Sequence, residues 1–177
     1  MPLSKLQTLS AWDLVYAVDG ALAAVVTYGL MAFIVPWIVN KPPTSVGILW
    51  AVISAVFVFK DTRAHSLSAG ISRLIATCVS FGLCLSYLLL FPANPLAMIL
   101  LIAASTLVMM LVGRRDEIGL TAISTAVVLI VAASEPHDAW QQPLLRLMDT
   151  VAGVAVGIAL KWIASSLFFR VMGEDVR

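Results

Sequence analysis

The chain has 177 residues, of which 61% are hydrophobic and 12% are charged, and its mean hydropathy is +1.01. A soluble domain carries about 25% charged residues. This composition therefore predicts an integral membrane protein and leaves no room for a separate soluble catalytic domain. The formal net charge of +1 does not point to nucleic acid or another charged partner, because in a membrane protein the positions of the charges matter most.

Six apolar segments approach the length of about 20 residues that crosses a bilayer. They cover approximately residues 14–38, 46–59, 74–91, 95–112, 118–133 and 144–169. Turn-forming or charged residues separate them at 40–43, 60–63, 92–95, 113–117 and 135–138. We therefore expect an all-α integral membrane fold, with residues 1–177 forming a single transmembrane domain of six helices.

The basic residues predict the orientation of these helices. With the N-terminus inside the cell, the cytoplasmic side would carry eight of them and the other side two. The eight are Lys5, Lys60, Arg63, Arg73, Arg114, Arg115, Arg170 and Arg177, and the two are Lys41 and Arg146. Cytoplasmic loops are enriched in Lys and Arg. Both termini are therefore expected in the cytoplasm.

A similar five-residue pattern opens two of the apolar segments, Arg73-Leu-Ile-Ala-Thr and Arg146-Leu-Met-Asp-Thr. An arginine in a membrane span costs about 2.5–3.5 kcal/mol on insertion scales, so two placed alike suggest a duplicated unit. Three crossings would insert the second unit upside down, giving a 3+3 inverted repeat of residues 14–91 and 95–169. The second and fifth spans also look short, at about 14 and 16 residues, and short helices in matching places indicate a transporter's binding site.

Small and polar residues form a stripe along one face of the third and the sixth spans, because they recur every three or four residues. The stripes are Ser66, Gly70, Arg73, Thr77, Ser80 and Cys84, and Arg146, Thr150, Gly153, Gly157, Lys161 and Ala164. Such a stripe either lines a wet path or lets a neighbouring helix approach closely. Gly153 and Gly157 fit the second use.

Several of these residues resemble the membrane module of the fusaric acid resistance and aromatic acid exporter family. The resemblance lies in the run from Trp50 to Val58, in Ser72-Arg73-Leu74 followed by Thr77 and Gly82, and in the stretch from Arg146 to Gly153 with the pattern R-x-x-D-x-x-x-G. The chain departs from the family pattern at Ala76, where a glycine usually precedes the threonine.

The resemblance implies a six-helix transporter module that exports organic acids. Plant aluminium-activated malate transporters are similar to the same module, and they form dimers with arginines near an anion path. Many relatives carry two membrane modules or large soluble regions, so a homodimer of this single module would restore the double unit. Whether an accessory subunit is also needed stays open.

Arg73 and Arg146 are the first candidates for an anion site. A guanidinium presents a planar fork of donors that matches a carboxylate, and it stays charged at any working pH. The alternative is that each arginine reaches the headgroups and only anchors its helix. Asp149 follows Arg146 by three residues and could pair with it. Lys161 lies about 22 Å further along the helix, where it would raise the potential at the inner mouth or reach the interface.

Four further polar or aromatic residues are candidates. Thr77 and Thr150 each follow an arginine by four residues and share its stripe, so we expect them along the same path. Trp50, in the short second span, would either stack on an aromatic substrate or pack between helices. Asp19, inside the first span, would carry protons in a proton-coupled exporter or serve as a counter-ion to a basic residue.

Other chemistries have little support in the sequence. His65 and His137 are expected on loops on opposite sides without further ligands nearby, so neither a metal nor another cofactor is expected. No glycine-rich phosphate loop is present, so ATP does not drive this chain directly. Ser134, His137 and Asp138 form only a loop cluster, and we expect no enzyme activity.

We therefore expect a multi-pass protein of the cell inner membrane that carries or conducts small organic anions, aromatic carboxylates among them, as a homodimer. The alternative is a non-transporting accessory subunit that uses its small-residue stripes to bind partners. No nucleic-acid partner is expected.

Overall fold

The computed structural model describes residues 11–36, 44–60 and 62–172, and within these ranges every regular element is helical. The elements are α1 (Ala11–Gly29), the π-helical turn η1 (Leu30–Ile34), α3 (Ser45–Val58), α4 (Arg63–Leu88), α5 (Pro95–Leu111), the 3-10 turn η2 (Arg115–Glu117), α6 (Ile118–Ser134), the 3-10 turn η3 (Pro136–Asp138) and α7 (Gln141–Met172). The predicted break at 40–43 and the basic residues Lys5, Lys41 and Arg177 lie outside the described residues.

Side-chain caps define where several helices begin. Thr44 accepts a hydrogen bond from the Gly47 N–H at the start of α3, and Asn94 accepts one from the Ala97 N–H at the start of α5. Pro95 occupies the first turn of α5, where its missing N–H is not needed. α5 is followed by Gly113, whose φ of +77° reverses the chain toward α6.

α4 begins earlier than the apolar pattern predicted. Thr62 accepts a hydrogen bond of 3.1 Å from the His65 N–H and caps the helix. Ser66 and Gly70 are helical, as their place in the stripe indicated, whereas His65, expected on a loop, lies in the first turn of the helix. The predicted start of the third span at Leu74 is therefore wrong by eleven residues. Arg73 lies about three turns into α4, and Arg146 lies in the second turn of α7.

Among the described residues, four helical segments are long and apolar enough to span a membrane: Tyr16–Ile34, Arg63–Leu88, Arg115–Ser134 and Gln141–Ser166. α3 and α5 are apolar but shorter, with 14 and 17 residues. The predicted short second span is present as α3. The fifth span is not distinguished by its length, because α6 has 17 residues, as α5 does, and forms a segment of 20 residues together with η2.

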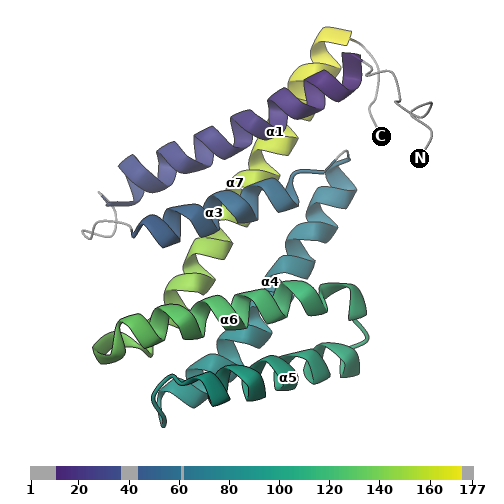
Figure 1. Ribbon diagram of the computed structural model, residues 1–177. Helices are drawn as coiled ribbons and strands as arrows, with labels where there is room; N and C mark the ends of the chain where they lie inside the picture. The colour runs from purple at the N-terminus through teal and green to yellow at the C-terminus, as the bar shows by residue number, and fades with distance from the viewer. Residues whose placement is uncertain (1–10, 37–43, 61, 173–177) are drawn as a thin grey trace, which may run out of the picture.

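The helices form two pairs that are joined by the two longest helices (Figure 1). α1 packs on α3, and α5 packs on α6. α4 and α7 pack along each other; α7 also packs on α3, and α4 also packs on α6. This arrangement brings α7 against α3 and α4, which lie far from it in the sequence.

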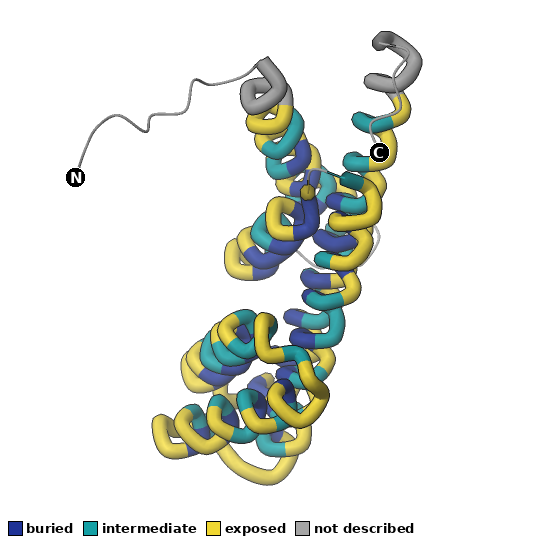
Figure 2. Tube along the Cα trace, turned by 90° about the vertical axis from the view of Figure 1, so that its right-hand side faces the viewer, coloured by how far each residue is buried: buried dark blue, intermediate teal, exposed yellow. Residues whose placement is uncertain are grey.

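Buried residues lie where the helices meet, and exposed residues cover the outer faces (Figure 2). One apolar core forms between α4, α5 and α6 from residues that include Cys84, Leu101 and Val128. The outer faces carry large apolar side chains such as Phe33 and Leu111, which are 70% and 87% exposed. Lipid-facing surfaces have this character, so the side chains that remain polar and buried mark the interior.

Candidate anion site

Trp50 lies in the middle of α3 and is the residue that both predicted arginines reach. Its side chain is buried. The guanidinium carbon of Arg73 lies 5.7 Å from the centroid of its ring, and that of Arg146 lies 5.6 Å away. A cation within about 6 Å of an indole ring is attracted by its electron-rich face. Two charges that are 73 residues apart in the sequence therefore meet at one aromatic residue.

Arg73 is held on α3 by a hydroxyl and by two rings. It is 2% exposed, and its Nε donates a hydrogen bond of 2.9 Å to Ser54 Oγ. Its guanidinium carbon also lies 5.1 Å from the centroid of the Phe57 ring. The charge therefore points into the helix bundle and not toward the membrane surface.

Arg146 reaches the beginning of α3 from α7. It is 3% exposed, and its Nη1 donates a hydrogen bond of 3.1 Å to the carbonyl oxygen of Val46. The same nitrogen lies 3.6 Å from Asp149 Oδ2. The predicted pairing of Arg146 with Asp149 on one helix face is therefore present, at ion-pair distance.

Two glycines allow α7 to approach α3 closely enough for these contacts. A Cβ at Gly153 would overlap the carbonyl oxygen of Ala51 and would lie 2.7 Å from Ser54 Cβ. A Cβ at Gly157 would lie 2.8 Å from the carbonyl oxygen of Ala55. The predicted packing role of Gly153 and Gly157 is thus what the geometry shows, and their partner is a helix of the same chain.

The predicted threonines lie beside the arginines. Thr77 on α4 and Thr150 on α7 are 3% and 0% exposed. We call Trp50, Arg73, Arg146, Asp149 and Thr150 the two-arginine cluster, because each of these residues carries one buried side-chain atom without a hydrogen-bond partner among the described residues. The atoms are Trp50 Nε1, Arg73 Nη1, Arg146 Nε, Asp149 Oδ2 and Thr150 Oγ1.

The two-arginine cluster contains buried donors that no described residue satisfies. A buried donor without an acceptor costs about 1–3 kcal/mol. Asp149 is the only carboxylate within ion-pair distance of either arginine in the part of the chain that the structure describes. Two guanidiniums against one carboxylate leave the cluster positively charged.

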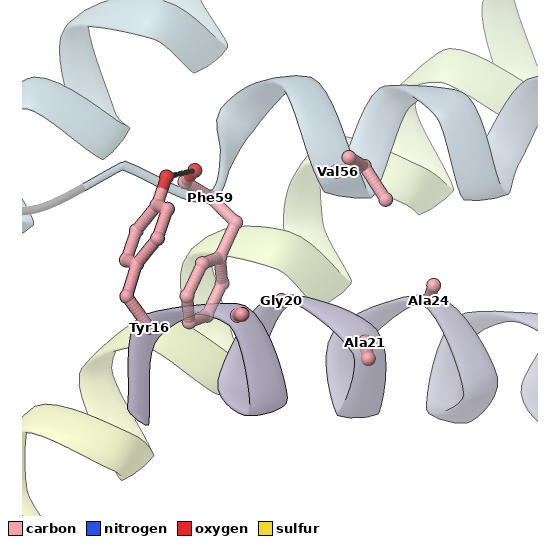
Figure 3. A pocket seen from close by; sticks show the side chains of 7 residues that line it. Tyr16, Gly20, Ala21, Ala24, Val56 and Phe59 are labelled. Atoms are coloured by element: carbon pink, nitrogen blue, oxygen red, sulfur yellow. Dashed lines mark hydrogen bonds between the residues drawn. The ribbon is translucent and has the colours of Figure 1, made fainter. Parts of the chain in front are cut away.

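Lys161 and Asp19 lie apart from the two-arginine cluster. Lys161 Nζ lies 5.1 Å from the centroid of the Phe59 ring, at the far end of α3 from Arg146. Phe59 also borders a pocket of about 330 Å³ between α1 and α3, where the Tyr16 hydroxyl donates to the Phe59 carbonyl oxygen (Figure 3). Asp19 is half-buried on α1. The structure does not bring these two residues to the arginines.

Ser54 and Phe57 were missed as site residues by the sequence analysis. Ser54 follows Trp50 by four residues, so both lie on one face of the helix, and this spacing could have identified it. Phe57 gave no signal, because one more aromatic residue in an apolar span is ordinary. Gly47 was also missed. A Cβ at this position would lie 3.1 Å from Asp149 Oδ2, and Asp149 is distant in the sequence.

The hydroxyls of α6 serve a different contact. Thr125 Oγ1 donates a hydrogen bond of 3.2 Å to Ser80 Oγ on α4, and Thr121 and Ser124 are buried beside it. Both stripes are therefore used where helices meet: the stripe of α4 includes a contact with α6, and the stripe of α7 packs on α3.

Apolar helices of spanning length that bury two arginines define a multi-pass helical membrane protein. A family model described as fusaric acid resistance protein-like matches residues 47–160. The chain therefore belongs to this family, as the resemblance of its spans predicted. The matched region contains the whole two-arginine cluster. Neither a curated protein nor a solved structure matches the chain.

Proposed function

We propose that this protein transports organic anions across the membrane and binds them at the two-arginine cluster. Membership of the fusaric acid resistance protein-like family suggests a membrane transporter of organic acids. The observation that carries the proposal is the convergence of Arg73 and Arg146 on Trp50, with unpartnered donors on all three. These donors match the oxygen atoms of a carboxylate. Aromatic carboxylates are the class we would test first.

We further infer that the fold is a 3+3 inverted repeat, with α1, α3 and α4 related to α5, α6 and α7. Each helix contact supports this, because it has a counterpart when the halves are exchanged: α1–α3 with α5–α6, α3–α7 with α6–α4, and α1–α7 with α5–α4. Four stripe positions, each pair 73 residues apart, are also buried in both halves. They are Arg73 and Arg146, Thr77 and Thr150, Ser80 and Gly153, and Cys84 and Gly157.

The proposed orientation places both termini in the cytoplasm. Arg73 and Arg146 lie inside helices and no longer count as loop charges. The remaining loop residues still support the orientation, since Arg114 and Arg115 lie between α5 and α6 on the proposed cytoplasmic side. We propose a homodimer in the cell inner membrane and export as the direction of transport.

Anion flux into proteoliposomes that contain the purified protein tests the function. Benzoate, malate and chloride would be compared, with and without a proton gradient. We expect benzoate flux that falls by at least about tenfold in Arg73→Ala and in Arg146→Ala, because each removes a charged hydrogen-bond donor. Arg115→Ala, which removes an exposed arginine outside the cluster, is the matched control. Equal flux in all variants would argue against the proposed site.

The accessory-subunit alternative has less support. It requires small-residue stripes that are free to bind a partner, whereas Gly153 and Gly157 pack against Ala51 and Ala55 of the same chain. An absence of flux from a protein that is folded and monodisperse in detergent would nevertheless favour it.

A further inference from the structure

Asp149 is an incompletely paired carboxylate beside Arg146. Its Oδ2 lies 3.6 Å from Arg146 Nη1, but this oxygen accepts no hydrogen bond from any described residue. Arg146 uses the same Nη1 to donate to Val46 and keeps its Nε without a partner. A buried pair that served only stability would gain from hydrogen bonds to both partners. In this pair, Asp149 Oδ2 and Arg146 Nε lack such bonds to any described residue.

The first turn of α3 provides space for the same carboxylate. A Cβ at Gly47 would lie 3.1 Å from Asp149 Oδ2 and 3.2 Å from both Asp149 Oδ1 and Thr44 Oγ1, so any other residue would crowd the carboxylate here. The N-terminus of a helix carries a partial positive charge. Asp149 therefore lies between two positive groups, the guanidinium of Arg146 and the beginning of α3.

We propose that Asp149 is a tethered competitor that occupies Arg146 in the empty site and gives way when a substrate carboxylate binds. The inference rests on the proposed function and adds a form of regulation to it. The entering carboxylate takes the donors of Arg146, including the free Nε, and Asp149 moves away from the guanidinium. The contact between Asp149 and Arg146 therefore lowers the affinity of the site for an anion, because the anion must replace Asp149.

Benzoate binding to the purified full-length protein tests this inference in Asp149→Asn. The amide keeps the shape of the side chain and removes its charge. We expect benzoate to bind about tenfold more tightly or better, because the competing ionic contact is lost. Unchanged or weaker binding in a folded variant would show that the pair supports the site and would overturn the inference.

Gly47→Ala separates competition from a general effect of charge. The added methyl group would crowd both carboxylate oxygens of Asp149 and leave the charge in the protein, so we expect its contact with Arg146 to weaken and benzoate affinity again to increase. Gly82→Ala, at an α4 position where a Cβ would meet nothing within 4 Å, is the control and should bind as the wild type does. Tighter binding in Asp149→Asn alone would indicate an effect of charge only and would also overturn competition.

The same experiment distinguishes failure of the inference from failure of the proposed function. Benzoate binding by the wild type without an increase in either variant rejects the tethered competitor and leaves the anion site standing. An absence of benzoate binding in the wild type and in every folded variant rejects both.

Discussion

Arg73 Nε donates a hydrogen bond of 2.9 Å to Ser54 Oγ, and the same hydroxyl donates one of 2.8 Å to the carbonyl oxygen of Trp50. Ser54 therefore uses both its acceptor and its donor capacity within the protein. The consequence is that a charge on α4 is fixed to the backbone of α3, one turn from the indole ring that it faces. The position of Arg73 therefore depends on Ser54, a small and uncharged residue.

Ser54→Ala should loosen Arg73 without removing it. The Nε would lose its acceptor and join Nη1 as an unpartnered donor, which should lower the free energy of unfolding by about 1–3 kcal/mol. Benzoate affinity should also fall several-fold, since the guanidinium is no longer oriented. Thermal unfolding in detergent and benzoate binding would measure the two effects. Ser86→Ala, which removes an exposed hydroxyl bonded within α4, should change neither.

Trp50→Phe should weaken anion binding more than it weakens the fold. The phenyl ring still packs against both arginines, but the Nε1 donor is lost and the attraction for a cation is smaller. We expect benzoate affinity to fall by about tenfold and the unfolding temperature to change little. Trp50→Ala should in addition destabilise the protein by about 3–5 kcal/mol, because it removes a large buried ring. An unchanged benzoate affinity in Trp50→Phe would show that the indole N–H does not bind the anion.

Gly153→Ala should prevent α7 from packing on α3. The new methyl group would overlap the carbonyl oxygen of Ala51, a backbone atom that cannot move without the helix. Overpacking of this kind costs about 1–3 kcal/mol or more. We therefore expect little folded protein and the loss of the monodisperse peak in size-exclusion chromatography. Gly119→Ala, where a Cβ meets nothing within 4 Å, should express and fold normally. A normal yield of Gly153→Ala would contradict the close approach.

Single cysteines in the loops should report the proposed orientation. In a background without Cys78 and Cys84, Asp138→Cys should react with a membrane-impermeant maleimide in intact spheroplasts. Arg115→Cys should react only after the membrane is permeabilised, because the loop between α5 and α6 is proposed to face the cytoplasm. Reaction at both positions, or the reverse pattern, would refute the orientation.

The sequence predicts the helical character and the buried stripes of this fold well. Arg73, Thr77, Arg146 and Thr150 are buried as their spacing of three and four residues indicates, since that spacing places them on one face of each helix. The beginning of α4 was not predictable from hydropathy. The ten residues before Arg73 contain several polar side chains; the spacing of Ser66 and Gly70 indicated a helix there, but only the cap by Thr62 shows where it begins.

The convergence on Trp50 was also beyond the sequence. The sequence did not indicate which helix either arginine would face. In the structure Arg73 turns to Ser54, Trp50 and Phe57 on α3. The rotation of one helix against another depends on long-range packing, which a local pattern does not contain. Ser54 and Gly47 acquire their roles only from this packing.

The 14 residues of α3 make a helix about 21 Å long, whereas the hydrocarbon layer of a bilayer is about 30 Å thick. Any tilt reduces its reach across the membrane further. We therefore expect the bilayer to thin beside α3, or water to reach at least one of its ends. Either change would bring the two aqueous sides closer together at Trp50 than elsewhere in the membrane.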